Sequence, residues 1–153
     1  MASEVVRFKR VLHIREVERT VTQSELAEKL NQEREIQDRV TEMESQCDEA
    51  FEEFCAHGGE VVSPQQLWFE RQNLDAMEQN LDFGKKQLEF CRNEIEETKV
   101  VLVEKHRNVQ LMERYVDRLK ERAAKEMLAA EQNNLDDITS MRYLRTMRGG
   151  EGA

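Results

Sequence analysis

A branched aliphatic residue recurs at every seventh position through the second half of the chain. The series consists of Leu67, Leu74, Leu81, Leu88, Ile95, Leu102, Val109 and Val116, and Ala123 and Ala130 continue it. About one residue in five is Leu, Ile or Val, so eight successive matches would arise by chance only about a few times in a million. Because a strict seven-residue repeat keeps an apolar stripe on one face of an α-helix, the series predicts a long helix paired in a coiled coil.

A second row of positions, three residues further on in each heptad, is less apolar. Its members are Glu70, Met77, Gly84, Cys91, Thr98, Lys105, Met112 and Leu119. The small side chains of Gly84, Cys91 and Thr98 leave room at the helix surface, although they bury less apolar area. We therefore expect a partner helix to approach closely along this stretch.

The residues between positions 56 and 67 contain the signals of a helix end followed by a helix start. Gly58 or Gly59 can adopt the left-handed conformation that often terminates a helix. Ser63 is suited to the N-cap and Pro64 to the first helical position, and Gln66 completes a capping box. These signals predict a turn between two helices.

The first half of the chain contains a shorter apolar seam, whose spacing alternates between four and three residues. Its members are Ile36, Val40, Met43, Cys47, Ala50 and Phe54. Upstream, the apolar residues form three patches whose phases do not join: Val5, Phe8 and Leu12; Ile14, Val17 and Val21; Leu26 and Leu30. A shift of phase is typical of a local change in winding, so the sequence predicts an irregularity near residues 22–26.

Together these patterns predict an all-α protein, with two long helices in an antiparallel coiled-coil hairpin and the second helix the longer. We expect a single elongated domain over residues 1–153, with helices over about 5–57 and 64–147, a turn over 58–63 and a disordered tail over 148–153. Both helices rise about 1.5 Å per residue, so if they pair from the turn, the first helix reaches only as far as about residue 120 of the second. About 30 C-terminal residues would then have no partner within the chain.

The composition is typical of long, solvated helices and not of a compact globular core. The chain contains one Pro and six Gly, and 36% of its residues are charged against 6% aromatic. Its formal net charge of −9 argues against bulk binding to nucleic acid.

Features of the sequence also indicate the compartment. The longest apolar run in the middle of the chain, Val100–Val103, is far shorter than the roughly 20 residues of a membrane span. The first residues lack the charged and then apolar regions of a secretory signal, so we expect a cytoplasmic location. Cys47, Cys55 and Cys91 lack metal-like spacing and are expected to be small apolar core residues.

No combination of residues indicates catalysis. His13, His57 and His106 are scattered and belong to no metal-binding or nucleophile motif, and the sequence contains no phosphate-binding loop. The carboxylates are expected on solvated helix faces, where nothing would shift their pKa values. We therefore expect no enzymatic activity, catalytic residue, cofactor, metal or small-molecule substrate.

Charge is distributed unevenly along the chain. Residues 42–60 contain seven acidic residues and no basic one, whereas residues 99–125 contain eight basic residues against four acidic ones, and residues 1–19 contain five against three. In an antiparallel hairpin the last two stretches would lie side by side. The sequence therefore predicts an acidic turn end and a basic end at the chain termini, a polarity that can orient docking.

Aromatic residues occur outside the predicted seam. Phe69, Phe83 and Phe90 share one heptad position, and Trp68 lies beside the first of them. One interpretation is that the first helix wraps around and covers them with Phe51 and Phe54. The alternative is an exposed stripe of anchors for a protein partner, with Trp68, Phe69, Phe83 and Phe90 as candidate binding residues.

Both ends of the chain resemble FliJ-type proteins. Residues 6–16, Val-Arg-Phe-Lys-Arg-Val-Leu-His-Ile-Arg-Glu, are similar to the start of that family, where a phenylalanine precedes a leucine and a basic-acidic pair. Residues 131–138, Glu-Gln-Asn-Asn-Leu-Asp-Asp-Ile, resemble its C-terminal element and precede Arg142, Arg145 and Arg148. Asn133 and Asn134 depart from the charged residues expected there.

The resemblance implies a soluble component of the bacterial flagellar, or related type III, protein export apparatus. Proteins of this family resemble the central γ stalk of rotary ATPases. The resemblance implies three partners. They are a hexameric export ATPase that receives the paired terminal helices, a membrane export gate protein and export chaperones. It also implies peripheral association with the membrane apparatus. Candidate contacts with the ATPase ring are Arg7, Lys9, Arg10, Arg114, Arg118 and Arg122. The alternative function is a generic cytoskeletal or scaffold coiled coil that self-associates.

Overall fold

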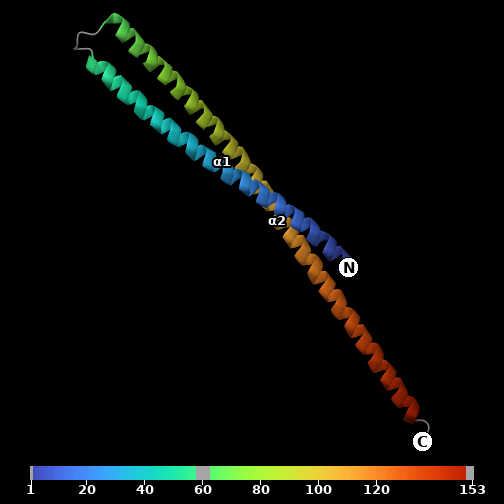
Figure 1. The fold of residues 1–153 in the computed structure, drawn as a ribbon. Coiled ribbons are helices and arrows are strands. Elements are labelled where there is room, and N and C mark those ends of the chain that lie inside the picture. The colour runs from blue at the N-terminus through green and yellow to red at the C-terminus, as the bar shows by residue number, and fades with distance from the viewer. Residues whose placement is uncertain (1, 58–62, 151–153) are drawn as a thin grey trace. The chain divides into compact units, whose positions relative to one another are not determined.

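The computed structural model describes residues 2–57 and 63–150, and these residues form two helices and no strand. Helix α1 spans Ala2–Ala56 and helix α2 spans Pro64–Gly150 (Figure 1). With 55 and 87 residues, the second helix is the longer one, as predicted. The helices pack against each other in opposite directions, which confirms the all-α helical hairpin.

The start of α2 follows from its capping residues. The Gln66 backbone N–H donates a hydrogen bond to Ser63 Oγ at 3.3 Å, and the Leu67 N–H donates to the Ser63 carbonyl at 3.2 Å. Ser63 therefore satisfies donors that a first helical turn leaves open, as the sequence predicts. Gly58 and Gly59, the predicted helix terminators, lie outside the described residues.

The far end of α2 extends beyond the predicted boundary. Residues 148–150, which the sequence assigns to a disordered tail, belong to the helix. Residues 151–153 lie outside the described part of the chain.

The structure divides into two compact units, each built from parts of both helices. One unit holds Met1–Arg19 and Lys105–Ala153, and the other holds Thr20–Glu104. The single elongated domain stays a prediction. We refer to these parts as the terminal unit and the middle unit.

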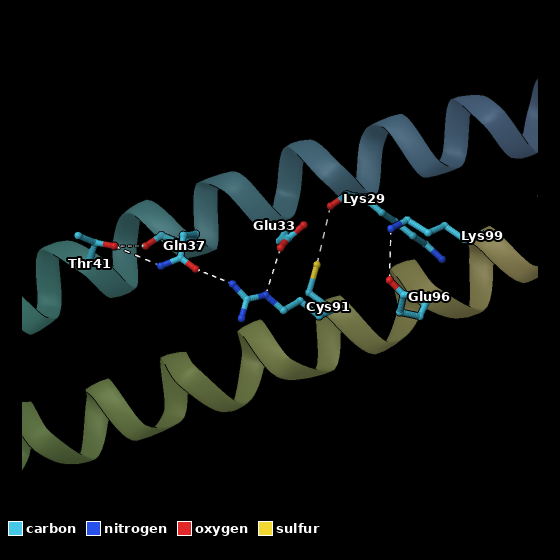
Figure 2. Close-up of polar contacts among 8 residues, drawn as sticks. Lys29, Glu33, Gln37, Thr41, Cys91, Glu96 and Lys99 are labelled. Atoms are coloured by element: carbon cyan, nitrogen blue, oxygen red, sulfur yellow. Dashed lines mark hydrogen bonds and ion pairs between the residues drawn. The ribbon is translucent and has the colours of Figure 1, made fainter.

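In the middle unit, contacts between the helices show that their directions are opposed. Lys29 Nζ donates to Thr98 Oγ1 at 2.9 Å, Arg92 Nε to Glu33 Oε1 at 3.1 Å, and Lys85 Nζ pairs with Glu44 at 3.5 Å. Residue numbers rise along α1 as they fall along α2. Figure 2 shows Lys29, Glu33 and Gln37 of α1 facing the segment of α2 that holds Cys91.

Both predicted rows of α2 face the partner helix. Members of the first row are buried at Leu88, Ile95, Val109 and Val116, and members of the second at Gly84, Cys91, Thr98 and Leu119. A Cβ atom added to Gly84 would lie 3.2 Å from Val40 Cγ2 and 3.6 Å from Met43 Sδ. The predicted close approach of the helices is therefore confirmed at Gly84.

The predicted irregularity near residues 22–26 is wrong. Helix α1 is uninterrupted, and its inward-facing positions keep one heptad phase: Val5, Phe8, Leu12, Arg19, Thr22, Leu26, Lys29, Glu33, Ile36 and Val40. Ile14, Val17 and Val21, which were expected to form one of the apolar patches, are exposed. The apolar patches lose phase because polar side chains fill four seam positions, not because the helix changes its winding.

Candidate protein-interaction surfaces

The terminal unit has an aromatic contact between its two helices. The rings of Phe8 on α1 and Tyr115 on α2 meet edge to face with centroids 4.9 Å apart. In the same unit Val109, Val116 and Leu119 are buried, with Val109 fully inaccessible. This packing fixes the two helix segments against each other.

Basic residues lie close in sequence to this contact on both helices, and on α2 they alternate with Glu113, Asp117 and Glu121. Between Val5 and Arg15, α1 carries four basic residues and no acidic one, and the Arg7 guanidinium lies 5.0 Å from the centre of the Phe8 ring. Arg114 adjoins Tyr115 on α2, and Arg118 lies about one helical turn further along. We call the exposed side chains of this region the basic surface; they are Arg7, Lys9, Arg10, Arg114, Arg118 and Arg122.

The structure therefore places all six predicted ring contacts in one unit and leaves all of them exposed. The Phe8–Tyr115 contact brings the three from α1 alongside Arg114 and Arg118, while Arg122 lies two turns further along α2. The terminal unit contains 15 Lys and Arg against 11 Asp and Glu. Such a surface is suited to an acidic partner.

The middle unit has the opposite charge and an exposed row of aromatic rings. It contains 8 Lys and Arg against 21 Asp and Glu. Trp68, Phe69, Phe83 and Phe90 are each at least 60% exposed, and Phe51 is also exposed. The interpretation that α1 covers these rings is therefore wrong, because its seam residues face the heptad rows of α2 and not this side of the helix.

Two of these rings border a shallow groove between the helices of the middle unit. The groove has a volume of about 590 Å³ and is lined by residues that include Ile36, Arg39, Phe83, Lys86 and Phe90. Trp68 and Phe69 lie nearer the turn and contact each other edge to face at 5.3 Å. Exposed apolar rings beside charged side chains are typical of protein-binding surfaces, and the binding role of the four rings stays a prediction.

Sequence reasoning missed a group of polar residues in the seam. An Arg19 Nη atom lies 3.2 Å from His106 Nδ1, and Lys29 donates to Thr98, whose hydroxyl donates in turn to the Glu94 carbonyl. Polar groups at seam positions are satisfied only when the correct partner lies opposite, so they favour one register at some cost in stability. Counting back in steps of seven residues from Val40 and from Ile36 would have predicted that these polar residues occupy seam positions.

The three cysteines differ in environment. Cys91 is buried, Cys47 is half-buried and Cys55 is exposed, so the expectation of a core position is wrong for Cys55. Burial raises the pKa of the Cys91 thiol, and the nearby carboxylates of Glu33 and Glu94 raise it further. This thiol is therefore protonated near neutral pH and is a poor nucleophile.

The described residues contain no group of three or more His, Cys, Asp or Glu side chains suited to a metal ion. His13 is exposed, His57 lies 3.8 Å from Glu70, and His106 contacts Arg19. Within residues 2–57 and 63–150, neither helix has a segment with the length and apolar character of a membrane span.

The family model described as the flagellar FliJ protein matches residues 3–148, which is nearly the whole chain. No curated protein and no solved structure matches the sequence.

Proposed function

Because the chain belongs to the FliJ family, whose members are components of the flagellar export apparatus, we propose that it acts there as a non-enzymatic stalk and adaptor. In this role the paired ends of α1 and α2 enter the hexameric export ATPase. The rest of the hairpin links the ring to the membrane export gate and to export chaperones. The protein acts in the cytoplasm, at the periphery of the membrane apparatus.

The observation that carries this proposal is the basic surface around the Phe8–Tyr115 contact. Six exposed cationic side chains from two helices form a site that a coiled coil does not need for its own stability. Long cationic side chains on a rigid helix pair can reach carboxylates on several sides of a surrounding ring. Because these side chains come from both helices, a partner can contact all of them only when the two helices are paired.

A stalk in a sixfold ring works through its asymmetry. A two-helix rod cannot make the same contacts with six subunits at once, so it stabilises some subunit conformations over others. Such differential binding is the requirement for shifting a conformational equilibrium. The stalk thereby changes nucleotide turnover without binding nucleotide itself.

The exposed rings of the middle unit suit the adaptor role. Trp68, Phe69, Phe83 and Phe90 are large, rigid side chains that lose little conformational entropy on binding. We assign them to the gate protein or the chaperones, because they lie in the unit that does not carry the basic surface.

The proposal is tested with the purified export ATPase. Adding the unmodified protein is expected to raise either ATPase oligomerisation or ATP hydrolysis. The Arg114→Glu, Arg118→Glu variant should abolish this effect and keep its helical circular dichroism, since both side chains are exposed.

The matched control is the Arg34→Glu, Arg71→Glu variant. It makes the same change in net charge at two exposed positions of the middle unit and should act like the unmodified protein. If the unmodified protein changes neither oligomerisation nor hydrolysis, the stalk role is wrong.

A further inference from the structure

The last part of α2 is a helix that lies against no other part of the described chain. Every residue of the segment 124–150 is exposed. We call this segment the arm. Its large apolar side chains, all at least half exposed, are Met127, Leu128, Leu135, Ile138, Met141, Tyr143, Leu144 and Met147. Most of the stability of a helix in a protein comes from packing of its apolar face, and exposed apolar side chains favour association.

A regularly spaced stripe of apolar and charged residues on the arm does not continue the seam used by α1. Leu128, Glu131, Leu135, Ile138, Arg142 and Arg145 follow one another at alternating spacings of three and four residues. The seam series Ala123 and Ala130 would next reach Asp137, two positions from Leu135. Because each residue turns an α-helix by about 100°, Leu135 lies about 160° around the helix from this series and Ile138 about 100°, so the new stripe lies on a different face. The arm therefore presents a second seam that is separate from the intramolecular one.

The stripe is matched to itself about the point midway between residues 136 and 137. If two arms pair in opposite directions about this point, each stripe residue faces another member of the stripe on the second copy. Leu135 of each then faces Ile138 of the other, and Glu131 of each faces Arg142 of the other. The outermost pair is Leu128 with Arg145.

Pairing in the same direction would have the reverse effect. Glu131 would face Glu131, and Arg142 and Arg145 would face their own copies. Like charges directly opposite each other disfavour an interface, whereas opposite charges specify partner and direction. The charge pattern thus selects a second copy of this chain in antiparallel orientation.

We infer that the arm is a self-association site, which pairs with the arm of a second copy in antiparallel orientation about the point midway between residues 136 and 137. The resulting two-fold interface is closed, because each arm uses the same stripe that it offers, so association stops at the dimer. This inference rests on the arm alone and does not depend on the export role.

Charge reversal tests the pairing in the full-length protein. Sedimentation equilibrium of the unmodified protein should show a monomer–dimer equilibrium at concentrations up to about 100 μM. Glu131→Arg places arginines at both facing positions, and Arg142→Glu places glutamates there. Each variant alone should dimerise at least about tenfold more weakly.

Two further samples separate this pairing from general damage to the helix. Mixing the Glu131→Arg and Arg142→Glu variants, or combining both changes in one chain, places opposite charges at facing positions again. Dimerisation should therefore recover. Glu126→Arg makes a similar change in charge away from the stripe and should leave the equilibrium unchanged.

A monomer at every concentration would overturn the inference and would assign the arm to a different protein. It would also be overturned if dimerisation were insensitive to both reversals, or if it failed to recover in the mixed and combined variants.

Discussion

Gly84 is a residue at which one added methyl group meets a packed neighbour. Its absent Cβ would lie 3.2 Å from Val40 Cγ2, and Val40 is only 3% exposed. A valine in a helix has one strongly preferred rotamer, so Val40 cannot move aside at low cost. Glycine is therefore favoured here although it disfavours the helix by about 1 kcal/mol relative to alanine.

The Gly84→Ala variant is accordingly expected to be less stable despite its better helix propensity. Overpacking typically costs about 1–3 kcal/mol and so outweighs the gain of about 1 kcal/mol. Urea unfolding followed by circular dichroism measures the difference. Gly149→Ala is the control, because nothing lies within 4 Å of the added Cβ.

A double-mutant cycle identifies the cause. In a Val40→Ala background the clash with Val40 Cγ2 is gone, so Gly84→Ala should cost clearly less than in the unmodified protein. Equal costs in the two backgrounds would mean that Val40 does not limit the space at Gly84.

At the scale of a single element, one side of α2 carries aromatic rings that are largely exposed. Phe83→Ala and Phe90→Ala remove side chains that are 64% and 66% exposed. Exposed substitutions usually change stability by less than about 0.5 kcal/mol, whereas loss of an interface anchor weakens binding about tenfold or more. We therefore expect an unchanged melting temperature and weaker binding to the soluble part of the export gate protein or to a chaperone.

Phe54→Ala is the comparison for this pair, since Phe54 is half-buried in the seam of α1. It should lower the melting temperature. The aromatic surface would lose its assigned role if Phe83→Ala lowered the melting temperature as much as Phe54→Ala does, or if binding were unchanged in both ring variants.

The periodicity of each element decided how much of the fold could be predicted. The series from Leu67 to Val116 is apolar at every member, so both rows of α2 and the hairpin follow from spacing alone. In α1, Arg19, Thr22, Lys29 and Glu33 occupy seam positions but have the composition of a solvated face. Their role depends on partners such as His106 and Thr98, which lie more than 65 residues away in sequence.

The candidate surfaces were predictable to different degrees. The basic residues could be placed near one another because an antiparallel turn pairs the two stretches. The exposure of Phe83 and Phe90 could not be decided from sequence, because it depends on which side of α2 the partner helix follows. Heptad position c is compatible with either outcome when the path of α1 is unknown.

At the scale of the whole molecule, the two units differ in charge and in what they expose. The terminal unit has a formal net charge of +4 and carries the basic surface and the arm, whereas the middle unit has −13 and carries the aromatic rings. A chain of this kind can contact chemically different partners with different units. The FliJ family match over residues 3–148 covers both.

The central claim is that the basic surface contacts the export ATPase, and site-specific photocrosslinking tests it most directly. A photoreactive phenylalanine analogue is placed at Arg118 in the terminal unit or, as the control, at Arg71 in the middle unit; both side chains are exposed. We predict a covalent product with the ATPase from position 118 and none from position 71. Crosslinking from position 71 alone, or equally from both positions, would contradict the assignment of the basic surface to the ring.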